Sequence, residues 1–428
     1  MVKRNGVFLG TKAGAMVAWL ALSMPTVSLA VPPTVTGSLD NRYSDNVTQS
    51  AVDEVSDTES RINLSIDHQT DPGRCMASTN AQVGYGTWWD EAYDPELYAD
   101  AAFFGDCEIR QGLNWELMDS LNQVLQNSRG TDTPDNRTLK NILRTGPRYT
   151  MFLGQRDQLS LSAQYQNTEF REPEETDSQR YIGSAAWNHI FDPTLSGGIS
   201  VSMDRAELDT GGEIDTDVAS LNWQKNWAVT QVSASIGYSK LTSRFGSFEQ
   251  SSDGLVGQVA LMRDVTGSLR FFLNASRELT DQTSDFDVRF GEFTFNLRQT
   301  SEVEVTALDV GADKSFSSGE TLRLVFFANR ADYLRVSQKE DSVGIDTVYT
   351  RPLGPLWNFD ASVRYEYANY DEASENDNTL SVDTRATYSL TRDLSLSGRV
   401  GHNRRESDRL ANEYEESWVS LGVSYQFR

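Results

Sequence analysis

Several residue types are scarce in this chain of 428 residues, which has two cysteines and three histidines. Two cysteines cannot build a disulfide-rich scaffold, and by themselves they cannot form a closed zinc site. The histidines lie far apart, at positions 68, 189 and 402, and lack the spacing of metal ligands. The sequence therefore predicts no metal and no cofactor.

Long hydrophobic runs and basic residues are also scarce. After residue 30 no apolar stretch is long enough for a transmembrane helix. The 38 lysines and arginines are outnumbered by 62 aspartates and glutamates, which gives a net charge of −24. So acidic a chain argues against nucleic acid as a partner, because it offers no broad basic face.

The first 30 residues predict a secretory signal peptide. They contain three basic residues, a short apolar run at 13–22 and the small residues Ser28 and Ala30 at a cleavage site. The alternative, a membrane anchor, needs a longer apolar run. We expect 1–30 to be removed and 31–428 to form one domain. Export permits a disulfide between Cys75 and Cys107, although both could also be plain core residues.

The chain ends in WVSLGVSYQFR, in which apolar residues alternate with small or polar ones. A period of two indicates a strand with one apolar face. An aromatic residue near the end of the last strand is typical of clients of the outer-membrane barrel assembly machinery. The candidate assembly residues are Leu421, Val423, Tyr425 and Phe427.

The same alternation recurs along the chain, for example at 357–367 and 379–390, and the connections alternate between short turns and long acidic loops such as 205–215, 279–296 and 404–416. This pattern predicts an all-β fold, a single transmembrane antiparallel up-and-down β-barrel in the bacterial outer membrane. We expect roughly 18–20 strands, with 20 the best count and 16 the lower alternative. A soluble sandwich or propeller is disfavoured, because several of the predicted strands exceed the usual five or six residues.

Two further expectations concern local structure. Aromatic residues gather beside the short turns, as at Trp187, Trp223 and Trp357, which predicts an interfacial girdle. Nearer the amino terminus the pattern is rougher. There, 107–117 is read as one strand and 118–121 as a short turn.

No catalytic signature is present: the sequence lacks GxSxG, HExxH, CxxC and a phosphate-binding loop. A Ser–His–Asp group could still be assembled from scattered residues, but only geometry would reveal it. We therefore expect no enzymatic activity.

Charged residues on the inward-facing positions of the strands are the better functional candidates. Such residues select what passes through a barrel, or they neutralise one another in a ladder that fills the interior. The candidates are Arg270, Asp309, Arg323, Asp360, Arg364, Glu366, Asp383 and Arg385.

Three segments carry a resemblance to a known family: TVTGSLDNRYSDNVTQS, TPDNRTLKNILRTGPRYTMFLGQRDQLSLSAQYQNTEF, and the stretch from SRELTDQ to GETLRL. They resemble the outer-membrane β-barrel family associated with exopolysaccharide and PEP-CTERM (exosortase) gene clusters, related to the type 2 β-barrel porins. The resemblance implies a passive conduit for a secreted exopolysaccharide. It also implies a periplasmic polysaccharide export protein as a partner, beside outer-membrane lipid, lipopolysaccharide and the barrel assembly machinery. The alternatives are a general diffusion porin, a structural or adhesive barrel, and an outer-membrane hydrolase.

Overall fold

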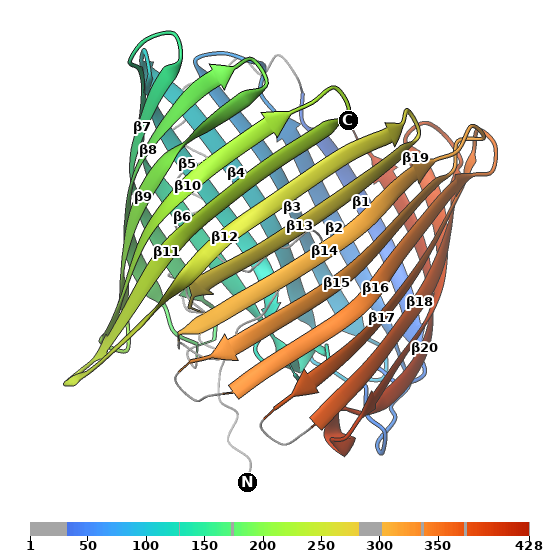
Figure 1. The fold of residues 1–428 in the computed structure, drawn as a ribbon. Helices are drawn as coiled ribbons and strands as arrows, with labels where there is room; N and C mark the ends of the chain where they lie inside the picture. The colour runs from blue at the N-terminus through green and yellow to red at the C-terminus, as the bar shows by residue number, and fades with distance from the viewer. Residues whose placement is uncertain are drawn as a thin grey trace.

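The computed structural model describes residues 32–127, 129–172, 175–281, 302–334, 338–371 and 375–427. In these residues twenty antiparallel strands form one sheet that closes on itself, which confirms the best predicted count (Figure 1). The predicted signal peptide, 1–30, lies outside the described residues.

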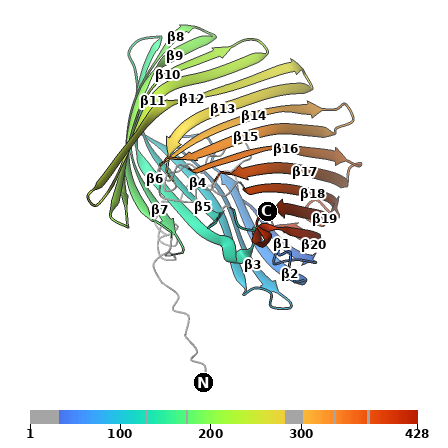
Figure 2. The same cartoon turned by 60° about the horizontal axis from the view of Figure 1, so that its bottom comes forward.

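The strands follow one another around the barrel in chain order, as Figures 1 and 2 show. Their bounds are β1 (Thr34–Ser44), β2 (Asp57–Gln69), β3 (Cys75–Trp88), β4 (Glu96–Arg110), β5 (Leu113–Leu125), β6 (Arg137–Phe152), β7 (Asp157–Phe170), β8 (Ser178–Asp192), β9 (Leu195–Leu208), β10 (Gly212–Asn226), β11 (Thr230–Phe245), β12 (Phe248–Thr266), β13 (Leu269–Thr280), β14 (Val303–Ser315), β15 (Thr321–Tyr333), β16 (Gln338–Pro352), β17 (Trp357–Tyr370), β18 (Glu375–Ser389), β19 (Leu394–Ser407) and β20 (Tyr414–Gln426). Two single 3-10 turns, η1 (Pro134–Asn136) and η2 (Leu410–Asn412), lie in connections.

The barrel closes where β1 pairs with β20, in a register that runs from Thr36 opposite Gln426 to Ser44 opposite Trp418. Closure gives every strand two partners, so the strands leave no edge with unpaired backbone groups. This explains the regular alternation at the end of the chain. The apolar set Leu421, Val423, Tyr425 and Phe427 lies exposed on the outer face of the barrel.

The connections differ between the two rims of the barrel. At one rim, here called the short-turn rim, every connection has two to five residues. The other, the long-loop rim, has connections of very different lengths, of which 45–56 is the longest that the structure describes throughout; 126–136 is described except at 128. Two predicted loops are shorter than expected, because the flanking strands extend into them: 209–211 remains of 205–215, and 408–413 of 404–416. Most of 279–296 lies outside the described residues.

Two local predictions near the amino terminus were wrong. The segment 107–117 is not one strand, because the chain turns between β4 and β5 at Gly112, whose φ is +76°. A glycine adopts this left-handed conformation without a side-chain clash. The predicted turn at 118–121 instead lies inside β5, where it continues the pairing with β6.

The outer face is apolar and carries aromatic residues next to the short turns. Trp187, Trp223 and Trp357 are all exposed there, together with Phe191 and Trp227. Amphipathic rings at this height are typical of the interfacial girdle of a membrane barrel. Among the described residues, no helix is long and apolar enough to cross a membrane.

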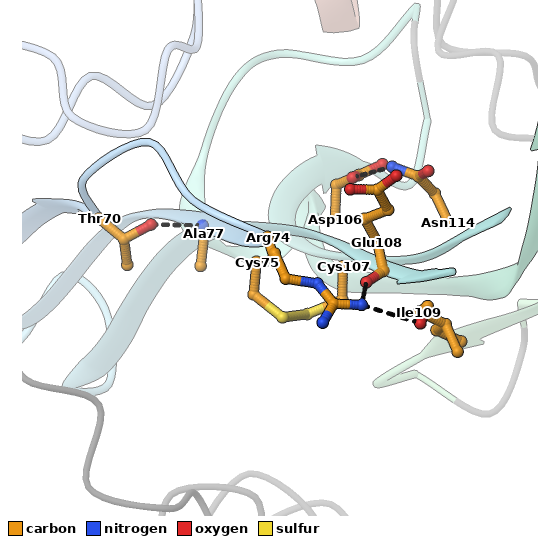
Figure 3. Close-up of a disulfide and its surroundings, with 9 residues drawn as sticks. All are labelled: Thr70, Arg74, Cys75, Ala77, Asp106, Cys107, Glu108, Ile109 and Asn114. Carbon is orange, nitrogen blue, oxygen red and sulfur yellow. Dashed lines mark hydrogen bonds between the residues drawn. A yellow bond between two sulfur atoms is a disulfide. The ribbon is translucent and has the colours of Figure 1, made fainter. Parts of the chain in front are cut away.

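Cys75 and Cys107 form a disulfide at the short-turn rim (Figure 3). They are directly opposite each other in the pairing of β3 with β4, which is why their side chains meet. Arg74 donates to the backbone oxygens of Glu108 and Ile109 beside the bridge, at 3.2 and 3.0 Å. The disulfide and these hydrogen bonds hold β3 and β4 together at a point where β2 is no longer paired with β3.

Candidate functional site in the barrel lumen

The pairing of the strands shows which charged residues face the lumen. Residues opposite each other on neighbouring strands share a face, and the exposed apolar residues mark the outer one. By this alternation the structure places all eight sequence-predicted lumen residues on the inner face: Arg270 on β13, Asp309 on β14, Arg323 on β15, Asp360, Arg364 and Glu366 on β17, and Asp383 and Arg385 on β18.

Most of the predicted charges on β17 and β18 have a partner. Arg364 and Glu366 form an ion pair at 3.0 Å, and Asp383 pairs with Arg399 of β19 at 2.7 Å. Asp360 accepts a hydrogen bond from Thr350 at 2.9 Å. This part of the wall therefore resembles a neutralised ladder, with the exposed Arg385 as the charge most open to the lumen.

The loop between β5 and β6, residues 126–136, reaches across the mouth of the barrel at the long-loop rim. Its Arg129 is 2% exposed and donates to Glu340 of β16, with Nε and Nη2 at 2.8 and 2.5 Å from Oε1. The same guanidinium lies over the ring of Tyr370 on β17, 4.4 Å from its centroid. β5 and β16 lie on different sides of the barrel, so this loop bridges its mouth.

Two further contacts hold the loop in place. Arg405 of β19 donates to the backbone oxygens of Arg129 and Gly130, at 2.8 and 3.0 Å, and also pairs with Asp377. On its other side the loop meets 45–56, where the Asp132 amide donates to Gln49 at 2.9 Å. We call residues 126–136 the bridge loop.

The loop between β3 and β4 joins the same rim structure. Tyr93 donates to the backbone oxygen of Val47 at 3.2 Å and packs edge-on against Trp88. Burial raises the pKa of Tyr93 to about 12, so this hydroxyl keeps its proton at neutral pH. Three loops at the long-loop rim are thus ordered by contacts with one another or with the inner wall.

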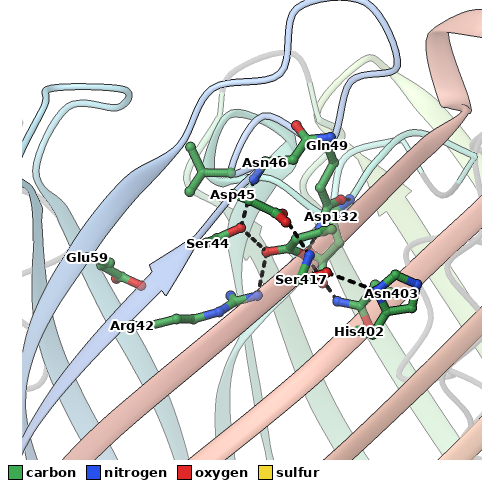
Figure 4. Close-up of polar contacts among 12 residues, drawn as sticks. Arg42, Ser44, Asp45, Asn46, Gln49, Glu59, Asp132, His402, Asn403 and Ser417 are labelled. Atoms are coloured by element: carbon green, nitrogen blue, oxygen red, sulfur yellow. Dashed lines mark hydrogen bonds and ion pairs between the residues drawn. The ribbon is translucent and has the colours of Figure 1, made fainter.

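A buried carboxylate connects the closing strands below this rim (Figure 4). Glu416 of β20 is 2% exposed and accepts hydrogen bonds from Arg42 and Ser44 of β1, each at 2.7 Å. Asn403 of β19 donates to its second oxygen at 3.0 Å, and Gln49 does so at 3.4 Å. A carboxylate that accepts this many hydrogen bonds fixes the seam between the first and last strands.

Large inward-facing rings lie flat on the wall instead of projecting into the lumen. The ring of Trp418 covers Gly401, the ring of Phe327 covers Gly344, and the ring of Phe272 covers Gly311. Arginine guanidinium groups stack on each ring, as Arg42 and Arg399 do on Trp418, at 4.7 and 4.9 Å from the ring centroid. A glycine beneath the ring leaves room for it, which keeps the lumen wider than these residues would otherwise allow.

Sequence reasoning placed the lumen charges by alternation but missed the bridge loop, the Glu416 cluster and the stacked rings. The bridge loop had a weak local signal, because NSRGTDTPDN is rich in turn-forming residues. Nothing in that signal indicates that Arg129 finds a partner 211 positions later in the chain. The inward glycines could have been paired with rings only if the strand register were known.

A serine, a histidine and a carboxylate do converge at one place, on the outer face. His402 Nδ1 lies 3.1 Å from Ser417 Oγ, and its Nε2 lies 3.8 Å from Glu415 Oε1. His402 and Ser417 are simply opposite each other in the pairing of β19 with β20. The Ser417 amide, one of the groups that could stabilise an oxyanion, already donates to Asp45. This contact is therefore that of a cross-strand pair.

Comparisons with known proteins agree with the architecture. A family model described as "Putative beta-barrel porin 2" matches residues 356–427, which contain β17 to β20. No curated protein matches the sequence. The chain is similar in structure to the FrpB iron transporter from Neisseria meningitidis (F5-1 variant), with 8% identity over 93% of this chain and 83% of that chain and a TM-score of 0.51.

Two more solved structures are similar to the chain. The apoprotein form of the same FrpB variant has 8% identity over 92% of this chain and 81% of that chain, with a TM-score of 0.50. The siderophore receptor PiuA from Acinetobacter baumannii has 9% identity over 93% and 82% of the two chains, with a TM-score of 0.49. At these identities the likeness to FrpB shows the fold alone. The chain has the fold of outer-membrane β-barrels, and its last four strands match the porin family model; neither kind of match concerns polysaccharide.

Proposed function

We propose that the protein is an outer-membrane β-barrel that acts as a passive conduit for a secreted exopolysaccharide. The main supporting observation is a closed barrel with an apolar outer face and a polar inner face on which charges such as Arg364 and Asp383 are paired. Polar groups that exchange hydrogen bonds with sugar hydroxyls without holding them tightly suit conduction. The resemblance of the sequence to exopolysaccharide-associated barrels supplies the substrate class.

The proposal includes location, partners and processing. The short-turn rim faces the periplasm and the long-loop rim the outside, as in other barrels of this kind. The barrel contacts outer-membrane lipid and lipopolysaccharide, reaches the membrane through the assembly machinery after removal of 1–30, and receives glycan from a periplasmic polysaccharide export protein. It performs no catalysis.

One observation favours a second candidate, a general diffusion porin for small solutes. The bridge loop narrows the mouth at the long-loop rim, which suits small solutes better than a polymer. Purified protein in lipid vesicles separates the two candidates. The conduit releases trapped neutral oligosaccharides of increasing length at slowly declining rates, whereas a sharp cut-off at the size of a disaccharide would favour the porin.

Reversing two lumen arginines tests the role of the inner wall. The double substitution Arg364→Glu and Arg385→Glu makes the lumen more acidic, so we expect the preference for cations over anions to rise about twofold or more. Reversal potentials in planar bilayers under a salt gradient measure this ratio. The control, Arg330→Glu with Arg404→Glu, makes the same charge change on the outer face. Equal preferences for cations over anions in the two double variants would show that lumen charge does not set the selectivity of the barrel.

A further inference from the structure

The inner wall contains a recess that extends over the strands from β10 to β16. Its volume is about 370 Å³. Three of the predicted lumen residues meet there, namely Asp309, Arg270 and Arg323. In the strand register Asp313 lies between Arg270 and Arg323, and Asp309 lies between Asn274 and Phe327. The volume falls within the range of sites for small ligands.

Asp309 is a buried inward carboxylate without a hydrogen-bond partner among the described residues. It is 1% exposed, and neither of its carboxylate oxygens has a hydrogen-bond partner in the described part of the chain. Asp360 and Asp383, by contrast, both accept hydrogen bonds from their neighbours. Burying a carboxylate without a partner is costly. A group of this kind in the wall of a recess is a candidate for binding a ligand that supplies the missing donors.

The surroundings of Asp309 indicate what such a ligand would be. Phe272, whose ring lies between Gly311 and the Arg323 guanidinium, lines the recess together with the amides of Gln224, Asn226 and Asn274. An aromatic ring beside a carboxylate and several amides suits a sugar residue, which has apolar C–H faces and hydroxyl groups at its edge.

The charges of the recess narrow the class of ligand further. Arg270 is already paired with Asp264 at 2.8 Å. The remaining charges of the recess are one arginine, Arg323, and three carboxylates, Asp309, Asp313 and Asp346. The recess is therefore acidic, which favours hydroxyl or ammonium donors and opposes a ligand that brings its own carboxylate. An acidic sugar would place like charges together in a confined space.

We propose that this recess is a glycan-binding subsite for one neutral or amine-bearing sugar residue. Asp309 accepts hydrogen bonds from the hydroxyl or ammonium groups, and the Phe272 ring, on which Arg323 stacks, forms part of the wall beside the sugar. This inference rests on the proposed function and specifies the substrate class of the same lumen. Binding at the subsite is reversible, so that the glycan moves on along the wall.

The test measures binding to the full-length protein in detergent by saturation-transfer NMR and titration calorimetry. The probes are cellotetraose, which is neutral, tetraglucosamine, which is cationic, and tetragalacturonate, which is anionic. We expect the first two to bind and the third to bind at least tenfold more weakly. Asp309→Asn should weaken binding of the first two by about tenfold, because a hydrogen bond to a charged group is lost. Asp341→Asn, a matched change on the outer face opposite Arg330, should leave binding unchanged.

A second measurement, unfolding of the barrel in urea, also does not depend on conduction. Asp309→Asn should raise the urea concentration at which the barrel unfolds, because the buried charge is removed. Equal binding in the Asp309→Asn and Asp341→Asn proteins would overturn the subsite, as would equal binding of tetragalacturonate or displacement of cellotetraose by Ca²⁺. These outcomes concern binding alone. Failure of export in cells lacking the protein is a separate result, so the subsite and the export proposal can fail independently.

Discussion

Replacing Arg129 with alanine is expected to raise the single-channel conductance of the barrel several-fold. Arg129 and Glu340 are both buried, with side chains 3% and 9% exposed, and they hold the bridge loop across the mouth. Removing one partner of a buried ion pair leaves the other charge without compensation and costs about 3–5 kcal/mol. The contacts that remain are those of Arg405 with the backbone oxygens of Arg129 and Gly130 and of the Asp132 amide with Gln49, and a loss of about 3–5 kcal/mol exceeds the roughly 0.5–1.5 kcal/mol that each of these hydrogen bonds contributes.

The matched control for this prediction is Arg137→Ala. Arg137 belongs to the base of the same loop and pairs with Asp132, which is 54% exposed, at 2.7 Å. Exposed pairs contribute roughly 0–1 kcal/mol, so this change should leave conductance close to that of the unmodified protein. Conductance in planar bilayers separates the two variants. If Arg129→Ala and Arg137→Ala conduct alike, the bridge loop does not limit passage.

Replacing Gly401 with valine is expected to have the opposite effect and to lower conductance by roughly half. A Cβ at position 401 would lie 2.4 Å from Cζ2 and 2.5 Å from Cε2 of Trp418, so the ring must leave the wall. The ring would then project into the lumen and lose its stacking with Arg42 and Arg399. The lumen becomes narrower at the seam between the first and last strands.

Two variants check that the ring causes this effect. Gly398→Val lies on the outer face of the same strand, where a Cβ would meet only Leu421 at 3.7 Å, and should change conductance little. Adding Trp418→Ala to Gly401→Val should restore conductance, because the displaced ring is gone. If conductance stays low when Trp418→Ala is added to Gly401→Val, the valine acts on the backbone and not through the ring.

The architecture could be predicted from sequence because each strand carries its own signal. In a barrel the inner and outer faces differ along every strand, so alternation identifies both the strand and the direction of each side chain, as it did for β17 and β18. The inward positions of Arg364 and Asp383 follow from this alternation alone. Errors arose where the signal depends on one residue, as at Gly112, whose left-handed conformation ends one strand and begins the next.

The contacts that define the lumen could not be predicted in the same way, because they depend on register and on closure. Glu416 meets Arg42 only because β20 pairs with β1 across nearly the whole length of the chain. Arg129 reaches Glu340 across the mouth, and Cys75 meets Cys107 only in one register of β3 and β4. Periodicity fixes which face a residue occupies, but it says nothing about which residue lies beside it.

The central claim, that the barrel conducts an exopolysaccharide out of the cell, is tested most directly by deleting the gene. Polysaccharide is then measured separately in the medium and in the periplasm, with the wild-type gene restored on a plasmid as the control. The account predicts that polysaccharide falls in the medium and accumulates in the periplasm, and that the restored gene reverses both changes. Unchanged amounts in both fractions would contradict the export proposal and make the diffusion porin the better description of this barrel.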